Sequence, residues 1–203
     1  TWHWREAYPI NSYLVALTTT NHEHYTDWYV RDSGDSLPIE NYVYPEHLAE
    51  AVEDLSVTPE VMGLLEELFG DYPFWGEKYG HMVFSWYGAM EHQTCTSYGE
   101  HLLNGDHAYD RIVVHELAHS WFGNYVTLRD WENVWLNEGF ARYSEALWFE
   151  HRGGLPGLRD YMESITVQPV FQGPVYNNEV LFGSTVYGKG AWVVHMLRWI
   201  VQD

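Results

Sequence analysis

Apolar and polar positions near the start of the chain alternate as in β-strands. The runs YLVALTTT (13–20) and HYTDWYV (24–30) are rich in β-branched and aromatic residues, and RDSGDSLP (31–38) has the composition of a turn. The pattern changes near residue 40. We therefore expect residues 1–40 to be the end of a preceding β-rich domain with its linker.

From Pro45 the apolar spacing becomes helical. Two helices are predicted, over PEHLAEAVEDL and TPEVMGLLEELFG. In the second, Thr58 can cap the helix, Pro59 can occupy the first turn and Gly70 can end it.

The remaining chain predicts a strand pair followed by helices. The segment HMVFSWYGAMEHQTCTSY (81–98) alternates too weakly for a helix, so we expect strand, turn and strand. Four helices should follow, with glycines at 153, 154 and 157 separating the second from the third. Their expected ranges are 107–123, 131–151, 155–166 and 186–202.

The segment IVVHELAHSWFGN (112–124) carries two histidines and an acid in an apolar setting. On a helix, His115 and His119 would stack on one face roughly 6 Å apart, so both rings could reach a common point. Neutral imidazoles are good zinc ligands. Glu116, rotated by about 100° from His115, could stand beside such a metal without binding it.

A chance match on a surface helix is the alternative interpretation of this motif. The flanking residues argue against it, because the apolar run before His115 and the residues Leu117, Ala118, Trp121 and Phe122 indicate a mostly buried helix. Buried histidines and acids need partners. The segment therefore predicts a metal site.

A catalytic zinc site needs a third protein ligand, and WLNEGFARYSEALWFE offers one. Glu138 lies 19 positions after His119, enough for the first helix to end at Gly123 and for the next helix to return antiparallel. Glu145, two turns further along the same face, is a candidate acceptor for a ligand histidine N–H or another buried donor. A partly solvated helix acid is an equal alternative for Glu145.

Four motifs together resemble a known family. HELAHSWFGN is followed after eighteen residues by the Glu of WLNEGFA, GAMEH (88–92) resembles a G-A/G-M-E-N motif, and VYGKGAWVVHMLR resembles a Y-x-K-G helix start. In this order and spacing they resemble the gluzincin metallopeptidases of the aminopeptidase N family. YPINSYLVAL is similar to the closing strands of that family's N-terminal β domain. The family's following helical domain and most of its β domain would belong to flanking parts of a longer parent chain.

The resemblance implies an α+β fold: a thermolysin-like zinc peptidase catalytic domain over 41–203, with a small mixed sheet beside a helical lobe. It implies one Zn²⁺ per chain on His115, His119 and Glu138, with Glu116 as general base. Such an enzyme removes N-terminal residues from peptides by attack of a metal-activated water.

The remaining motifs imply how substrate is held. Tyr187 would donate a hydrogen bond to the developing oxyanion. Since the chain has 16 tyrosines, only the YGKG context singles out this one. Glu91 would pair with the free α-amine of the substrate. The strand TCTSY that follows could add backbone hydrogen bonds to an extended peptide. The substrate-binding residues implied in this way are Gly88, Ala89, Met90, Glu91 and His92.

His92 departs from the family pattern, which usually has Asn there. Imidazole is bulkier than a carboxamide and can carry charge, which affects amine anchoring and the fit of the first side chain. The remaining histidines, including those of NHEHY (21–25) and His101 and His107, lack a ligand geometry and are expected at the surface.

Composition excludes some partners. A net charge of −19, with only two lysines, repels nucleic acid and anionic membrane surfaces. The longest apolar stretch, AWVVHMLRWIV, is about half of the roughly 20 residues that a membrane span needs. One cysteine cannot form an internal disulfide. No targeting segment is visible and the compartment stays open.

Two other functions compete with an aminopeptidase. A zinc endopeptidase, or a hydrolase of the same family with another substrate, would act on N-blocked peptides. A non-enzymatic interaction scaffold would be expected to lose the base or the ligands, whereas this sequence keeps His115, Glu116, His119, Glu138 and Tyr187.

Overall fold

The structure, a computed structural model, describes residues 5–166 and 171–201. The chain divides into two compact units, Thr1–Ser120 and Trp121–Asp203. Each unit is described by itself.

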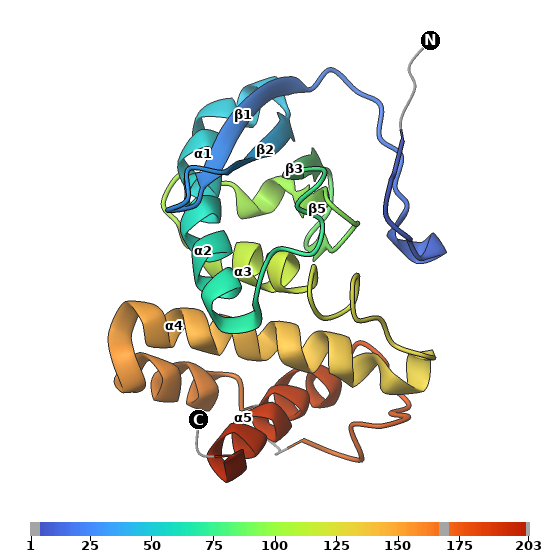
Figure 1. Ribbon diagram of the computed structural model, residues 1–203. Helices are drawn as coiled ribbons and strands as arrows, with labels where there is room; N and C mark the ends of the chain where they lie inside the picture. Colours follow the sequence, from blue (N-terminus) through green and yellow to red (C-terminus); the bar gives the residue numbers. More distant parts are fainter. Residues whose placement is uncertain (1–4, 167–170, 202–203) are drawn as a thin grey trace. The chain divides into compact units, whose positions relative to one another are not determined.

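Unit 1 contains a five-stranded sheet (Figure 1). The strand order is β1-β2-β3-β5-β4; the central pairs β2–β3 and β3–β5 are parallel and the outer pairs antiparallel. The predicted small mixed sheet is thereby confirmed. The strands are β1 (Glu23–Val30), β2 (Ser36–Val43), β3 (Tyr79–Phe84), β4 (Ala89–Met90) and β5 (Thr96–Gly99).

The first strands only partly follow the prediction. The strand expected over 24–30 is confirmed as β1, but the strand expected over 13–20 is wrong: that segment has one 3₁₀ turn, Ser12–Leu14, and Leu17 is 93% exposed. A strand needs a hydrogen-bonded neighbour, and none of the described strands pairs with this segment.

The hairpin after β1 is tighter than the sequence predicts. The turn expected over 31–38 closes by a hydrogen bond from the Arg31 N–H to the Asp35 carbonyl (2.9 Å), so β2 already begins at Ser36. β1 and β2 continue the sheet of β3 across residue 40. The division of the parent chain into a β domain to residue 40 and a catalytic domain over 41–203 stays a prediction.

The α-helices among the described residues of unit 1 are α1 (Leu48–Asp54), α2 (Thr58–Phe69) and α3 (Asp110–Ala118). α2 packs against β1 and α3. Gly70 ends α2 with φ +88°, as predicted. Thr58 is not the cap, because a 3₁₀ turn leads into the helix and the Thr58 hydroxyl donates backwards to the Leu55 carbonyl (2.7 Å).

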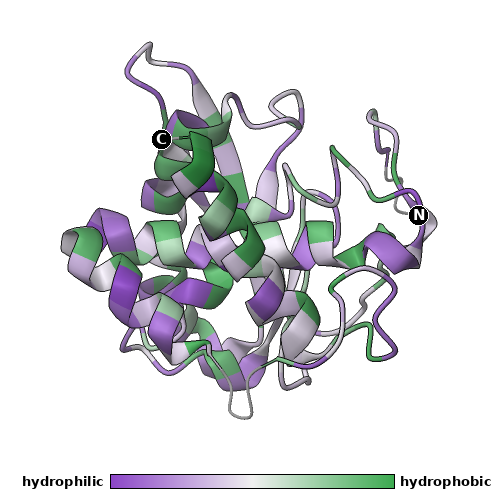
Figure 2. Ribbon diagram, turned by 90° about the horizontal axis from the view of Figure 1, so that it is seen from below, coloured by the Kyte–Doolittle hydropathy of each residue, from purple (hydrophilic) through white to green (hydrophobic). Residues whose placement is uncertain are grey.

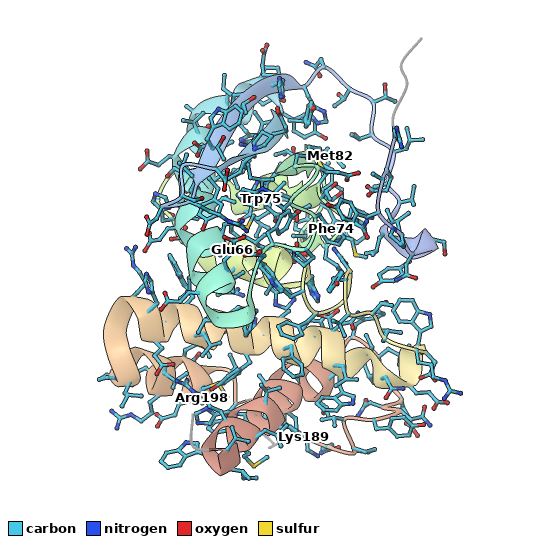
Figure 3. All side chains as sticks on the ribbon, viewed as in Figure 1. Glu66, Phe74, Trp75, Met82, Lys189 and Arg198 are labelled. Carbon is cyan, nitrogen blue, oxygen red and sulfur yellow. The ribbon has the colours of Figure 1, made fainter. Side chains whose placement is uncertain are left out.

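An ion pair ties the β1–β2 hairpin to α2. Glu66, labelled with Trp75 in Figure 3, accepts hydrogen bonds from Arg31 Nε (2.8 Å) and from the Tyr29 hydroxyl (2.9 Å). The Arg31 guanidinium lies 3.5 Å from the centroid of the Trp75 ring. Burial alone would raise the pKa of Glu66, but Arg31 and the other donors lower it overall. Glu66 is therefore ionised and holds the hairpin in place.

Unit 2 contains α4 (Val134–Ser164) and α5 (Gly190–Val201), which pack against each other. The two helices predicted over 131–151 and 155–166 are joined through a kink at Gly154 (φ 64°, ψ −164°), so the predicted separation by glycine is confirmed. A π-helical turn, Thr185–Lys189, leads into α5. Residue 202, the last of the predicted fourth helix, lies outside the described residues.

α5 is predominantly apolar (Figure 2), and Trp199 and Ile200 near its end are about three-quarters exposed. Within the described residues, no helix has both the length and the apolar character that crossing a membrane requires.

His81 in β3 gives a testable pH dependence of stability. Its side chain is fully buried, and its Nδ1 is hydrogen-bonded to Asn41 Oδ1 (2.8 Å) on β2. Burial, with a smaller effect of Lys78, lowers the pKa of His81 to about 3. In the unfolded chain His81 has a pKa of about 6.5. Below that pH the unfolded chain binds a proton that the folded chain does not bind, so the free energy of unfolding falls as pH falls.

We expect the free energy of unfolding to drop by roughly 2 kcal/mol between pH 7 and pH 5 through His81. Urea denaturation at both pH values measures this. His81→Gln is the matched variant, since its amide can still donate to Asn41 without titrating, and it should lose that part of the pH dependence. Equal pH dependence in the two proteins would contradict the assignment.

Candidate active site

The two candidate ligand histidines lie at the end of α3. This helix ends at Ala118, not at Gly123 as predicted. His119 nevertheless keeps helical dihedral angles (φ −59°, ψ −21°), and its N–H donates to the His115 carbonyl (3.3 Å). The ring centroids lie 4.8 Å apart with the planes at 80°. The two imidazoles therefore share one face although the helix is shorter than expected.

Burial removes this segment from water. The exposed fractions of His115, Glu116 and His119 are 7%, 6% and 1%. Imidazoles and carboxylates in such a place need a proton, a hydrogen-bond partner or a metal. Two neighbouring imidazoles with nearby acids form a donor set that suits zinc, so the residues present fit this metal.

Glu91 lies beside the same segment within unit 1. One carboxylate oxygen each of Glu91 and Glu116 and one ring nitrogen of His119 lie within 4.8 Å of one another. Glu91 is itself buried, with 7% of its surface exposed. Two buried carboxylates this close repel each other when both are ionised, so a cation between them would be favoured.

The GAMEH segment runs along an edge of the sheet. β4 is the last strand in the sheet order, and α3 contacts it. β5, which contains most of TCTSY, lies between β3 and β4, so the expectation that this strand offers hydrogen bonds to a peptide is wrong. Gly88 accepts from the Gly99 N–H (2.9 Å) on the β5 side. Ala89 and Met90 are therefore the residues at the sheet edge.

His92 follows Glu91 in a turn and is half-buried. Its Nδ1 is hydrogen-bonded to Ser97 Oγ (2.7 Å). Burial lowers the pKa of His92, and the charge of Glu91 only partly offsets this. The neutral imidazole is favoured, so the positive charge that the sequence allowed for at this position arises only below the ordinary pKa of histidine.

Two further candidates belong to unit 2. Glu138 lies in the first turns of α4 and is 5% exposed. Tyr187 lies in the middle of the π turn before α5 and is half-buried. Their roles as third metal ligand and oxyanion donor stay predictions.

Glu145 is fully buried, which excludes the partly solvated acid. Its two oxygens accept hydrogen bonds from Arg142 Nη1 (3.0 and 3.1 Å), and Oε2 also accepts from the Tyr161 hydroxyl (2.5 Å). Glu145 thus accepts hydrogen bonds from buried donors other than a ligand histidine, which is one of the two acceptor roles that the sequence left open.

Sequence reasoning missed Arg142 and Tyr161. Burial alone would lower the pKa of Arg142, but Glu145, Tyr161 and Tyr187 raise it overall. Arg142 is therefore a fixed cation within electrostatic reach of Tyr187. Its spacing of three residues from Glu145 was a visible signal, whereas the approach of Tyr161 depends on the kink at Gly154.

The other histidines take part in ordinary contacts. His22 is hydrogen-bonded to the Val83 carbonyl (2.9 Å), His24 pairs with Glu40, and His107 pairs with Asp110 (2.9 Å). Within residues 5–166 and 171–201, they belong to no group of side chains with metal-ligand spacing.

Several known proteins are similar to this chain in sequence. The chain is 28% identical to glutamyl aminopeptidase of Sus scrofa over 226 residues, covering 98% of this chain and 23% of that protein. It is 31% identical to aminopeptidase Ey of Gallus gallus over 219 residues, covering 93% and 22%. The chain therefore spans about a quarter of the length of these relatives.

A solved structure agrees with the fold. An M1 zinc metallopeptidase from Deinococcus radiodurans superimposes with a TM-score of 0.71 at 28% identity, covering 90% of this chain and 41% of that one. The fold is accordingly the α+β metallopeptidase fold expected from the sequence. Residues 53–203 match the Peptidase family M1 domain. Because this match covers most of the chain and includes the HELAH, NEGFA and YGKG segments, the chain belongs to peptidase family M1.

Proposed function

We propose that the full-length protein is a zinc-dependent aminopeptidase that removes N-terminal residues from peptides. The observation that carries this proposal is the buried group of Glu91, Glu116 and His119. It combines a carboxylate for the substrate amine with a carboxylate for proton transfer beside an imidazole. The aminopeptidases and zinc metallopeptidases among the similar proteins support the same activity.

His115, His119 and Glu138 would hold one zinc ion per chain. The burial of all three and the common face of the two imidazoles support this assignment. When bound, zinc would polarise the substrate carbonyl and make a water molecule more acidic. We do not assign Glu145, the other buried acid of α4, as a ligand, because its carboxylate accepts hydrogen bonds from Arg142 and Tyr161.

Glu116 would move the proton. It would accept a proton from the attacking water and pass it to the departing amine, acting as base and then as acid. Tyr187 would donate its hydroxyl hydrogen to the oxygen on which negative charge develops. The fixed positive charge of Arg142 makes Tyr187 a better donor.

Glu91 would select the free amine. A substrate α-ammonium placed between Glu91 and Glu116 would relieve the repulsion of these carboxylates and align the first peptide bond. The edge of β4 at Ala89 and Met90 would bind the peptide backbone. The expected partners are thus peptides with a free N-terminus, together with the flanking domains of the parent chain, and the net charge of −19 argues against nucleic acid.

An endopeptidase or altered-substrate hydrolase of the same family is the second candidate. It would need no charge at Glu91 and would cleave N-blocked peptides at the same rate as free ones. An interaction scaffold would show no turnover.

The test compares free and N-acetylated forms of one peptide in the full-length protein. Glu91→Gln removes the charge but keeps the shape, so hydrolysis of the free peptide should fall about 30-fold, the equivalent of about 2 kcal/mol for one charged hydrogen bond. Hydrolysis of the acetylated peptide, already slow, should change less than threefold (about 0.6 kcal/mol).

Glu67→Gln serves as the control, since it removes an equally negative but exposed side chain of α2. It should leave both rates unchanged. Equal hydrolysis of both peptides by the wild-type protein, with neither rate lowered in Glu91→Gln, would favour the endopeptidase. Absence of turnover in the zinc-loaded wild-type protein would favour the scaffold.

A further inference from the structure

Two glycines of unit 2 meet where α4 and α5 cross. A Cβ on Gly139 would lie 2.9 Å from the carbonyl carbon of Gly190 and 3.0 Å from its Cα. A Cβ on Gly190 would lie 3.0 Å from the Cα of Gly139 and 3.4 Å from the carbonyl oxygen of Trp135. The opposing atoms are backbone, so no side-chain rotation could make room. The two helices approach this closely only because neither glycine has a side chain.

Along the chain, the two glycines are close to two residues of the proposed site. Glu138 directly precedes Gly139, and Tyr187 precedes Gly190 by three residues. Both pairs belong to unit 2. At this glycine contact the segment of the proposed metal ligand therefore meets the segment of the proposed oxyanion donor.

A second set of contacts holds the π turn from the other side. The Thr185 hydroxyl donates to the Gln172 carbonyl (3.0 Å), and Lys189 Nζ donates to the Gly173 carbonyl (2.6 Å). A π turn is rare and is found mostly at functional sites, where its surroundings stabilise it. Lys189 and Arg198 are labelled in Figure 3 toward opposite ends of α5.

We propose that the Gly139–Gly190 contact and the Lys189–Gly173 hydrogen bond together position Tyr187 relative to Glu138. This inference rests on the proposed function, because it takes the role of Tyr187 from there. A hydrogen bond to a developing oxyanion depends on sub-ångström placement, so a turn pushed outward by one methyl group loses much of its effect. Gly139, Gly190 and Lys189 are positioning residues that act through Tyr187.

The test uses Gly190→Ala in the zinc-loaded full-length protein. We expect kcat to fall about 10-fold or more, with KM and zinc content unchanged, because ground-state binding does not use the tyrosine. The matched control is Gly153→Ala, the same substitution within α4 at a position where an added Cβ meets no atom within 4 Å. It should leave kcat unchanged.

Lys189→Met adds no atom to the contact between α4 and α5. It removes only the hydrogen bond from Lys189 Nζ to the Gly173 carbonyl, which lies at the exposed surface. It should also lower kcat without changing KM, and it carries the test if Gly190→Ala does not fold. Unchanged kcat in Lys189→Met, or in a folded Gly190→Ala protein, would overturn the proposal.

A double-mutant cycle with Tyr187→Phe separates positioning from general packing. If Gly190 and Lys189 act through the Tyr187 hydroxyl, their substitution should cost less than twofold in kcat once that hydroxyl is gone. Equal losses in both backgrounds would overturn the inference but leave the role of Tyr187 intact. If Tyr187→Phe alone leaves kcat unchanged, the proposed role of Tyr187 fails, and the inference fails with it.

Discussion

Replacing Glu116 with Gln is expected to lower kcat about 1,000-fold while the protein keeps its zinc. The amide has the shape of the carboxylate but cannot accept the proton of the attacking water. Because Glu116 is assigned to proton transfer and not to metal binding, the zinc content should equal that of the wild-type protein. Steady-state kinetics with metal analysis on the full-length protein measures both quantities.

Glu138→Gln is the contrasting variant. It weakens a proposed zinc ligand, so zinc content and activity should fall together. If Glu116→Gln also loses its zinc, Glu116 is a ligand and the base is another residue. If Glu116→Gln keeps full activity, the proton-transfer role is wrong.

Tyr187→Phe is expected to lower kcat roughly 100-fold while changing KM little. The hydroxyl would act only when negative charge develops on the substrate oxygen, so its removal leaves substrate binding in the ground state unchanged. Zinc content should not change. Kinetics over a range of peptide concentrations separates kcat from KM.

Tyr125→Phe is the matched control, because Tyr125 is 65% exposed and precedes α4. It should retain full activity. A raised KM with unchanged kcat in Tyr187→Phe would mean that this tyrosine binds substrate and that another donor stabilises the oxyanion.

Local sequence signals predicted the parts of the fold that depend on local chemistry. The end of α2 at Gly70 follows from the positive φ that glycine allows, and the shared face of His115 and His119 follows from helical periodicity. The kink at Gly154 was visible as a glycine cluster. These features need only a few neighbouring residues.

Signals that depend on distant partners were not visible. The run 13–20 has strand composition, but no described strand pairs with it, so it stays irregular and Leu17 is exposed. The first residues of β2, 36–38, lie in the segment with turn composition, and β2 was not predicted as a strand, although its residues 39–42 pair with β3. Composition gives the tendency of a segment to form a strand, and a neighbouring strand with which it can pair decides whether the strand forms.

The candidate site divides in the same way. The motifs named His115, Glu116, His119 and Glu91, and unit 1 brings Glu91, Glu116 and His119 into one buried group. The contact of Tyr161 with Glu145 and the Gly139–Gly190 contact had no motif, because the first arises only when α4 kinks and the second only when α5 packs against α4. Residues that position others are therefore found from the structure.

The most direct test of the account is to locate the metal and the substrate amine together. Crystals of the full-length Glu116→Gln protein with zinc and an uncleaved peptide would show the metal by anomalous scattering at the zinc edge. We expect one zinc about 2 Å from ligand atoms of His115, His119 and Glu138, with the peptide amine hydrogen-bonded to Glu91. Zinc bonded to Glu91, or a peptide whose amine lies away from Glu91, would contradict it.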